Sequence, residues 1–187
     1  MESSTKQPTT PVKLLLLDID GVMTDGTKAY NTAGEVISKS YCDLDFTAIK
    51  RFKQHGYEPI FISGDKRVNE AMARSRKITF IYSKDEKGKI DKSVYVDHFY
   101  EIYWIESKDM IYVGDDVYDI GIMSLCGEAF CPSNSPNIVK NAATTILKSR
   151  SGQGCIAELY DLIFPLSKQE YPNDLWTENK SWKLQIR

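Results

Sequence analysis

The stretch from residue 14 to residue 26 reads Leu14-Leu15-Leu16-Leu17-Asp18-Ile19-Asp20-Gly21-Val22-Met23-Thr24-Asp25-Gly26. Four consecutive leucines are typical of a strand that is buried on both faces, as in a parallel sheet. The strand ends on two acids and a glycine, and open α/β sheets bind ligands at the carboxyl ends of their strands. Taken alone, the stretch is equally typical of a strand that leaves the core through a solvated acidic turn.

Length and charge indicate one globular domain without a general affinity for nucleic acid or membranes. A chain of 187 residues suits a single core. The net charge of −2 gives no overall attraction to nucleic acid or to an anionic membrane. No apolar run reaches the roughly 20 residues that a membrane helix needs. Residues 1–11 are polar and contain proline, so we expect a loose N-terminal arm, no signal peptide and a cytoplasmic location.

Predicted strands and helices alternate along the chain. The strands are predicted at 14–17, 58–62, 78–82, 110–113, 129–130 and 145–147, and the helices at 43–55, 66–76, 91–105, 118–125, 137–142 and 153–163. Two of these helices carry apolar stripes that include Leu44 and Ile102. Short runs around an Asn/Gly turn predict a hairpin over residues 27–40.

This alternation predicts an α/β fold, namely a three-layer, doubly wound (Rossmann-like) parallel sheet with helices on both faces. The hairpin forms a small flap at the end of the sheet where Asp18 lies. We expect the domain to occupy residues 12–164 and to be followed by a C-terminal tail over residues 165–187.

Chemically active side chains follow four of the predicted strands. They are Asp18 and Asp20 after the first strand, Ser63 after the second, Lys92 a short way after the third, and Asp115 and Asp116 after the fourth. Parallel strands bring their carboxyl ends to one rim of the sheet. Individually, Ser63 suits a turn, Lys92 a solvated helix, and Asp116 or Asp119 a helix cap. Taken together, their order along the chain and their positions at strand ends favour a functional site.

The residue types predict the chemistry of this site. Converging carboxylates need a cation, and oxygen ligands without histidine or thiol favour Mg²⁺ over Zn²⁺. Asp18, the main-chain carbonyl of Asp20 and Asp115 can supply part of an octahedron, while Ser63 and Lys92 can hold a phosphate. An anionic nucleophile and an anionic phosphate repel by about 4 kcal/mol per pair of unit charges at roughly 4 Å. A divalent ion offsets this repulsion, so the set predicts phosphoryl transfer.

The same residues resemble the four motifs of the haloacid dehalogenase superfamily of phosphatases. The matching segments are residues 18–26, Ser63-Gly64, Lys92, and Gly114-Asp115-Asp116 with Asp119, and the resemblance spans about residues 14–164. The hairpin and the lack of room for a cap domain resemble one capless subfamily. Its members are phosphatases of 3-deoxy-octulosonate 8-phosphate and of nonulosonate 9-phosphates, and the same domain occurs fused to sialic-acid cytidylyltransferases.

This resemblance implies a covalent mechanism. Asp18 is the nucleophile that forms an aspartyl-phosphate, and Asp20 protonates the leaving alkoxide and then activates water. Ser63 and Lys92 hold the phosphoryl group. Mg²⁺ is bound by Asp18, the Asp20 carbonyl and Asp115, with Asp116 and Asp119 in support. Lys89 is a second candidate for the motif lysine.

Departures from the family pattern bear on the substrate. Asp65-Lys66 resembles the acidic-lysine pair of the nonulosonate branch, where octulosonate enzymes usually carry arginine. Asp45 precedes Phe46, where relatives usually carry Asp-Gly in a segment that helps to contact the sugar. We expect a nonulosonate (KDN or N-acetylneuraminate) 9-phosphate as the substrate, with 3-deoxy-D-manno-octulosonate 8-phosphate as the alternative. The candidate contacts to this sugar phosphate are Asp20, Asp45, Lys50, Gly64, Lys66 and Arg74.

Two other protein classes share parts of this pattern. A signalling receiver domain also places acids, a hydroxyl and a lysine around Mg²⁺, but its phospho-accepting aspartate lies on a middle strand, which here ends in Ser63. A non-catalytic assembly domain has no need of Asp18, Asp20, Lys92 and Asp115 together. The phosphatase interpretation is therefore favoured.

The hairpin leads to an expectation about assembly. An isolated hairpin is marginally stable in water, and a phosphoryl-transfer site that is open to water loses electrostatic strength. The subfamily resemblance implies a homotetramer in which packed hairpins close neighbouring sites. We expect a homo-oligomer, a tetramer, in which hairpin or tail residues complete an adjacent site.

Overall fold

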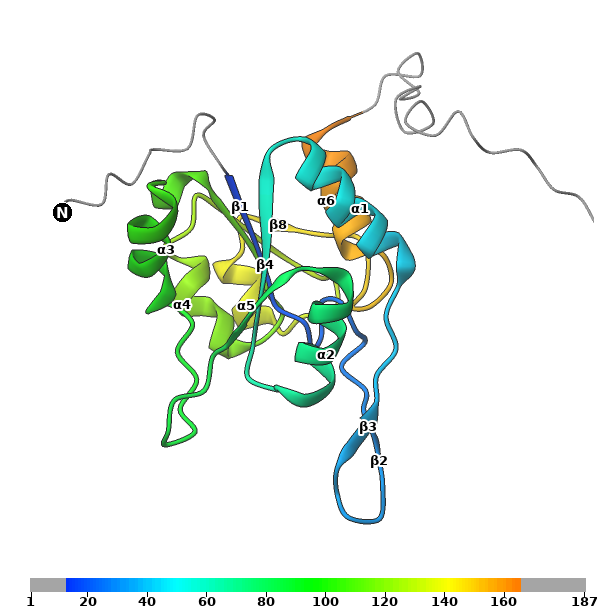
Figure 1. Cartoon of the computed structure of the whole chain (residues 1–187). Coiled ribbons are helices and arrows are strands. Elements are labelled where there is room, and N and C mark those ends of the chain that lie inside the picture. Colours follow the sequence, from blue (N-terminus) through cyan, green and yellow to red (C-terminus); the bar gives the residue numbers. More distant parts are fainter. Residues whose placement is uncertain (1–12, 166–187) are drawn as a thin grey trace, which may run out of the picture.

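The structure, a computed structural model, describes residues 13–165 and has a parallel sheet between two layers of helices (Figure 1). The strand order is β5-β4-β1-β6-β7-β8. The strands are β1 (Lys13–Leu17), β4 (Tyr57–Ser63), β5 (Thr79–Tyr82), β6 (Met110–Val113), β7 (Glu128–Cys131) and β8 (Thr145–Ile146). The chain order reverses between β1 and β6, which places the ligand crevice of such a sheet at the carboxyl end of β1. The predicted fold class is confirmed.

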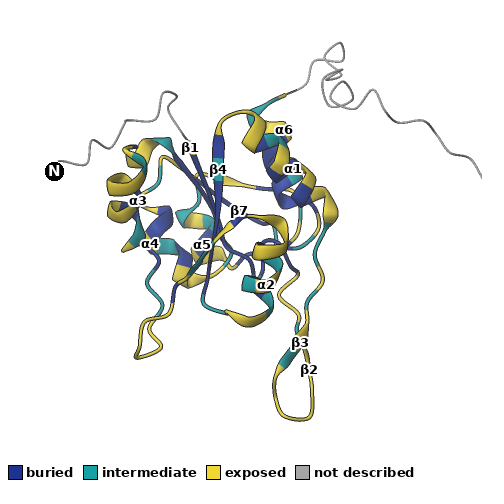
Figure 2. Cartoon of the chain, viewed as in Figure 1, coloured by how far each residue is buried: buried dark blue, intermediate teal, exposed yellow. Residues whose placement is uncertain are grey.

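Helices cover both faces of the sheet. One face carries α1 (Asp43–Gln54), α2 (Arg67–Arg76) and α6 (Cys155–Ile163), and the other carries α3 (Tyr95–Tyr103), α4 (Ile120–Met123) and α5 (Asn137–Ala142). The 3-10 turns η1 (Ser107–Asp109) and η2 (Val117–Asp119) precede β6 and α4. Figure 2 shows that burial concentrates in the sheet and in the inner faces of the helices.

The four leucines of β1 form the centre of the molecule. All four are fully buried, with Leu15 and Leu17 in the core beneath α1 and α6, and Leu14 and Leu16 in the core beneath α3 and α4. Successive side chains of a strand point to opposite faces, so a strand with a core on each side needs a continuous apolar run. Each buried leucine contributes about 1.5–3 kcal/mol relative to an exposed one.

Two predicted helix boundaries differ from the structure. The helix predicted over residues 91–105 begins only at Tyr95, because Asp91 forms a local turn in which its carboxylate accepts the N–H and hydroxyl of Ser93. The helix predicted over residues 118–125 is divided into η2 and α4. Both differences lie at the carboxyl ends of strands, where the loops carry side chains toward one another.

Two predicted core residues are exposed instead. Leu44 in α1 is 64% exposed and Ile102 in α3 is 53% exposed. Phe46 and Val96 are buried in their place. In α1 the neighbouring Asp45 is buried instead of Leu44, and its carboxylate accepts two N–H groups of α6.

The predicted hairpin is present as β2 (Ala29–Tyr30) and β3 (Val36–Ser38), an antiparallel pair that projects from the carboxyl end of the sheet (Figure 1). Between residues 13 and 165 no cap domain is inserted, as predicted. No helix in this range is long and apolar enough to cross a membrane. The predicted arm, residues 1–11, and the predicted tail after residue 165 lie outside the described residues.

Candidate active site

The loop after β1 is shaped by Gly21 and Thr24. Gly21 has φ of +93°, and a Cβ at this position would collide with the carboxylate of Asp115. The buried hydroxyl of Thr24 accepts the N–H groups of Gly21 at 3.3 Å and Gly26 at 3.2 Å. These contacts keep the turn compact, so that the loops after β1 and β6 approach each other.

Asp18, Asp115 and Asp119 converge where β1 and β6 end. One carboxylate oxygen of each lies within 4.8 Å of the others. The N–H of Asp18 donates to the carbonyl of Val113 at 2.9 Å, which fixes the first acid against β6. The structure therefore brings together carboxylates that are almost one hundred residues apart in the sequence.

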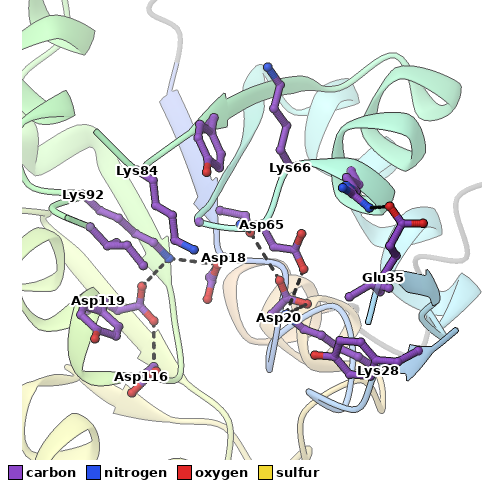
Figure 3. A pocket seen from close by; sticks show the side chains of 18 of the residues that line it. Asp18, Asp20, Lys28, Glu35, Asp65, Lys66, Lys84, Lys92, Asp116 and Asp119 are labelled. Carbon is purple, nitrogen blue, oxygen red and sulfur yellow. Dashed lines mark hydrogen bonds and ion pairs between the residues drawn. The ribbon is translucent and has the colours of Figure 1, made fainter. Parts of the chain in front are cut away.

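Lys92 reaches this cluster from the turn that precedes α3 (Figure 3). Its Nζ lies 2.9 Å from Oδ1 of Asp18 and 2.7 Å from Oδ1 of Asp119, and its side chain is 4% exposed. Burial opposes the charged form, but the two carboxylates outweigh it and raise the pKa of Lys92 above its usual value. The side chain of Lys89 is 72% exposed and pairs with Asp91. The structure thus places Lys92, rather than Lys89, in the site.

Asp119 holds the loop that follows β6. Its Oδ1 accepts hydrogen bonds from Lys92 and from the hydroxyl of Tyr112 at 2.7 Å. Its Oδ2 accepts the N–H groups of Asp115 at 2.9 Å and Asp116 at 3.0 Å. Because both oxygens already have two donors, Asp119 supports the site rather than offering a free ligand atom. Tyr112 is absent from the predicted site, although its hydroxyl is the one polar side-chain group in the apolar strand β6.

Asp116 forms a cap, in addition to lining the cavity. Its carboxylate accepts the N–H of Val117 at 2.6 Å at the start of η2. This is the capping role that its sequence position also suggested. Asp116 therefore orders the loop that carries Asp115 and Asp119.

Ser63 and Asp20 lie on the side of Asp18 opposite to Lys92. Ser63 is the last residue of β4, and Asp20 belongs to the loop after β1. The hydroxyl of Ser63 is 3.4 Å from Oδ2 of Asp20, and Ser63 is 1% exposed. The carboxylate of Asp20 also contacts Lys39 at 2.6 Å and Asn69 at 2.9 Å. Sequence reasoning missed Lys39 and Asn69, because neither follows a strand of the parallel sheet or lies in a recognisable motif.

A cavity of about 770 Å³ opens above these side chains. Its walls come from the hairpin, from the turn between β4 and α2, and from the loop between β5 and α3. Among the predicted residues it is lined by Asp18, Asp20, Ser63, Gly64, Lys66, Lys92, Asp116 and Asp119, but not by Asp115; further lining residues include Lys28, Glu35, Asp65, Arg67, Lys84, Tyr30, Tyr82 and Tyr118. The lysines and hydroxyl groups can bind an anionic ligand that carries many hydroxyls, and a cation held by the acids would offset their negative charge.

Three predicted substrate contacts do not line this cavity, which corrects the prediction. Asp45 is fully buried, and its Oδ1 accepts the N–H groups of Ile156 at 2.8 Å and Ala157 at 3.1 Å at the start of α6. Lys50 is exposed on α1. Arg74 lies on α2 near Glu70, with its side chain 80% exposed. All three lie on helices, away from the strand ends that form the cavity floor.

The acidic cluster fits a divalent cation. Oδ1 of Asp115 is buried and has no hydrogen-bond partner. Burial, reinforced by the charges of Asp18, Asp119 and Asp116, raises the pKa of Asp115 to about 8. Burial also raises the pKa of Asp18, even with Lys92 beside it. Asp18 and Asp115 would hold the ion, and their hard oxygen atoms favour Mg²⁺.

The raised pKa values of Asp115 and Asp18 predict how the metal-free protein responds to pH. A carboxylate whose pKa is raised by folding destabilises the folded state once it ionises, so stability is lost as pH rises from about 4 to about 8. We expect the Tm of the metal-free protein to fall by roughly 5–10 °C between about pH 5 and about pH 8. Mg²⁺ should restore most of the loss at the higher pH.

The matched variant is Asp115→Asn, which keeps the shape of the side chain and removes its charge. It should flatten this pH profile and abolish the response to Mg²⁺. Thermal unfolding followed by circular dichroism, in chelator and in excess Mg²⁺, measures both effects. A wild-type response to Mg²⁺ in Asp115→Asn would remove Asp115 from the metal site.

Comparison with known proteins agrees with this geometry. The chain is 28% identical over 152 residues to the 3-deoxy-D-manno-octulosonate 8-phosphate phosphatase of Haemophilus influenzae, with 81% of this chain and 82% of the relative covered. The solved cobalt-bound structure of the deoxy-D-mannose-octulosonate 8-phosphate phosphatase from that organism superposes with a TM-score of 0.74 at 27% identity, over 83% of this chain and 88% of the other.

A relative of another class is also similar over most of this chain. It is the N-acylneuraminate cytidylyltransferase of Oncorhynchus mykiss, 27% identical over 84% of this chain but only 36% of the relative. The profile of the haloacid dehalogenase-like hydrolase family matches residues 66–159, which is half of the chain and includes Lys92, Asp115 and Asp119. The chain therefore belongs to the haloacid dehalogenase-like hydrolase family.

Proposed function

We propose that this protein is a Mg²⁺-dependent phosphatase that hydrolyses 3-deoxy-D-manno-octulosonate 8-phosphate. The observation that carries the activity is the buried contact of Asp18 with Lys92, at 2.9 Å, with Asp115 close to Asp18 and with both partners of the contact lining a cavity whose walls also carry Lys28, Lys66 and Lys84. This arrangement offers a carboxylate nucleophile, a fixed positive charge and a place for a divalent cation. The relatives with the named activity support the choice of substrate.

In the first step, the free carboxylate oxygen of Asp18 attacks the phosphorus atom. The bond between phosphorus and the sugar oxygen breaks, and Asp20 gives its proton to that oxygen. The products of this step are the free sugar acid, an aspartyl-phosphate on Asp18 and an ionised Asp20. Lys92 and the hydroxyl of Ser63 hold the phosphoryl oxygens, and the bound cation supplies charge neutralisation.

In the second step, Asp20 takes a proton from a water molecule, and that water attacks the phosphorus atom. The bond between phosphorus and Asp18 breaks, which releases inorganic phosphate and restores both carboxyl groups. One acid serves both steps because the leaving oxygen and the attacking water occupy the same side of the phosphoryl group. The main-chain carbonyl of Asp20 belongs to the proposed metal ligands together with Asp18 and Asp115.

The contacts of Asp65 weaken the nonulosonate interpretation. That interpretation rested on Asp65-Lys66, yet Oδ2 of Asp65 is 2.9 Å from Nζ of Lys28 and 2.8 Å from Nζ of Lys39. Asp65 was not itself predicted to contact the sugar, and its two lysine partners account for its charge without a substrate. Because the relatives named as octulosonate phosphatases support the eight-carbon substrate, we prefer it. Lys66 and Lys84 line the cavity and can receive the carboxylate of the sugar acid.

The substrate is tested by comparing kcat/KM for two sugar phosphates under identical conditions. We expect 3-deoxy-D-manno-octulosonate 8-phosphate to exceed N-acetylneuraminate 9-phosphate by at least about tenfold, which corresponds to about 1.4 kcal/mol of transition-state binding. Release of inorganic phosphate is the measurement. A higher kcat/KM for the nine-carbon substrate would reinstate the nonulosonate assignment.

The assembly prediction concerns the hairpin. Tyr30 and Ile37 on its two strands are 59% and 60% exposed, and residues of this hairpin form one wall of the cavity. We propose a homotetramer in which packed hairpins cover neighbouring sites. Light scattering of the purified protein should give four times the chain mass. A monomer with full activity at assay concentration would refute the proposal.

A mixing experiment tests whether the sites are shared. An Asp18→Asn chain lacks the nucleophile, whereas an Ile37→Asp chain carries a damaged hairpin. If a hairpin completes a neighbouring site, co-refolded mixtures should regain activity that neither variant has alone. Self-contained sites should give only the average of the two separate activities.

A further inference from the structure

Asp20 lies in a polar network with two buried side chains, Lys39 and Asn69, that the phosphatase chemistry described above does not use. Its two oxygens have different partners: Oδ1 contacts Nζ of Lys39 at 2.6 Å, and Oδ2 accepts the side-chain N–H of Asn69 at 2.9 Å. The hydroxyl of Ser63 is the next contact, at 3.4 Å. The carboxyl group is therefore fixed from two sides, by the hairpin and by α2.

Lys39 has no free hydrogen-bonding capacity. Its side chain is 0% exposed, and its ammonium contacts Asp20, Oδ2 of Asp65 at 2.8 Å and Oδ1 of Asn69 at 2.9 Å. An ammonium has three donors, and each has an acceptor here. Because a buried lysine is costly unless it is fully paired, these acceptors specify one position for its charge.

Asn69 is the second member of the network, and it is also fully buried. Its amide nitrogen donates to Asp20 and to the Ser63 hydroxyl at 3.0 Å, and its oxygen accepts from Lys39 and from the Tyr41 hydroxyl at 3.1 Å. All four bonding positions of the amide are used. A helix residue that only filled space in the core would be apolar, so this asparagine indicates a requirement for its polar group.

We propose that Lys39 and Asn69 are positioning residues that hold the Asp20 carboxyl group in the place where it exchanges its proton with the leaving oxygen and with water. The inference rests on the proposed phosphatase function. A small displacement of a catalytic group costs about 100-fold in rate. A proton donor that is fixed on both oxygens keeps one geometry through both steps of the reaction.

The alternative role for this network is simply to attach the hairpin to the domain. The structure supplies a control for that role, because Oε1 of Glu35 at the hairpin accepts from Arg67 of α2 at 2.7 Å without touching Asp20. Glu35→Gln weakens an attachment of the hairpin and leaves the contacts of Asp20 intact. Lys39→Met and Asn69→Leu remove those contacts while keeping the side-chain volumes similar.

The test compares leaving groups that differ in their need for a proton. Phenoxide leaves phosphorus readily only when it is protonated, whereas p-nitrophenoxide leaves without a proton. With enzyme in excess, single-turnover release of phenol from phenyl phosphate and of p-nitrophenol from p-nitrophenyl phosphate reports the first step alone. Lys39→Met and Asn69→Leu should slow phenol release by about 10- to 100-fold and p-nitrophenol release by less than about threefold.

Two further variants make the outcome specific. Lys39→Arg keeps the charge and the donors, so it should recover most of the phenol rate. Glu35 itself lines the cavity, so Glu35→Gln is judged by the ratio of the phenol rate to the p-nitrophenol rate, which should stay at the wild-type value. Each variant must keep the thermal stabilisation by Mg²⁺ that is expected of the wild type. If Lys39→Met does not fold, Lys39→Gln takes its place, because it retains a donor.

Equal losses with both aryl phosphates, or an unchanged phenol rate, would overturn the positioning role. The aryl substrates also separate this inference from the proposed substrate. A protein that hydrolyses aryl phosphates but not 3-deoxy-D-manno-octulosonate 8-phosphate refutes the sugar assignment, and the comparison of leaving groups still decides the role of Lys39 and Asn69.

Discussion

Asp18→Asn is expected to lower kcat by at least about four orders of magnitude while the protein remains folded. The substitution keeps the size of the side chain and removes the nucleophilic oxygen. Lys92 keeps its second partner, Asp119, at 2.7 Å, so no buried ammonium is left unpaired. The loss should appear in kcat for every phosphate monoester, whatever its leaving group.

The matched control is Asp161→Asn, since Asp161 lies on α6 with its side chain 69% exposed. It should retain wild-type turnover. Wild-type protein quenched during turnover should carry one acid-stable, base-labile phosphate per chain, and Asp18→Asn should carry none. Turnover near the wild-type level in Asp18→Asn would exclude an aspartyl-phosphate mechanism.

The groups that the structure brings together as the sequence predicted share one physical property. Asp18 follows β1 directly, Ser63 is the last residue of β4 and Asp115 is two residues after β6, so their places depend mainly on the strand order. A parallel sheet brings those strand ends to one rim whatever the helices do. Lys92 lies further from its strand, and here the prediction needed the family resemblance to distinguish it from Lys89.

Residues on helices were harder to place. Asp45, Lys50 and Arg74 were assigned to the substrate, but the rotation of a helix about its axis depends on what it packs against. Asp45 binds two N–H groups of α6 that lie 111 and 112 residues away in the sequence. Nothing near Asp45 in the sequence indicates that partner.

Lys39 and Asn69 were missed for the same reason, because their contacts are also distant in the sequence. Lys39 contacts Asp20 and Asn69 across 19 and 30 residues, and each residue type alone is ordinary at its position. Their function becomes visible only when burial and mutual distances are known. The contacts of Asp65 likewise weaken the assignment of a nine-carbon substrate, which had rested on the resemblance of Asp65-Lys66 to the nonulosonate branch.

The last prediction separates the two candidate motif lysines. Lys92→Met removes an ammonium that lies within 2.9 Å of two buried carboxylates, and we expect it to lower kcat by about 10²–10³-fold, because a fixed positive charge in a desolvated site stabilises the transferring phosphoryl group. Lys89→Met is the control, since its side chain is 72% exposed and pairs only with Asp91. It should retain turnover within about twofold.

Stability gives an independent measure of the same difference. Lys92→Met leaves Asp18 and Asp119 without their shared counter-charge, and breaking a buried ion pair costs about 3–5 kcal/mol. The metal-free variant should therefore unfold well below the wild type, and Mg²⁺ should recover part of the loss by replacing the missing positive charge. Lys89→Met should unfold at the wild-type temperature, because water screens an exposed ion pair and leaves it little effect on stability. The reverse ranking, with Lys89→Met impaired and Lys92→Met active, would move the phosphoryl-binding charge from Lys92 to Lys89.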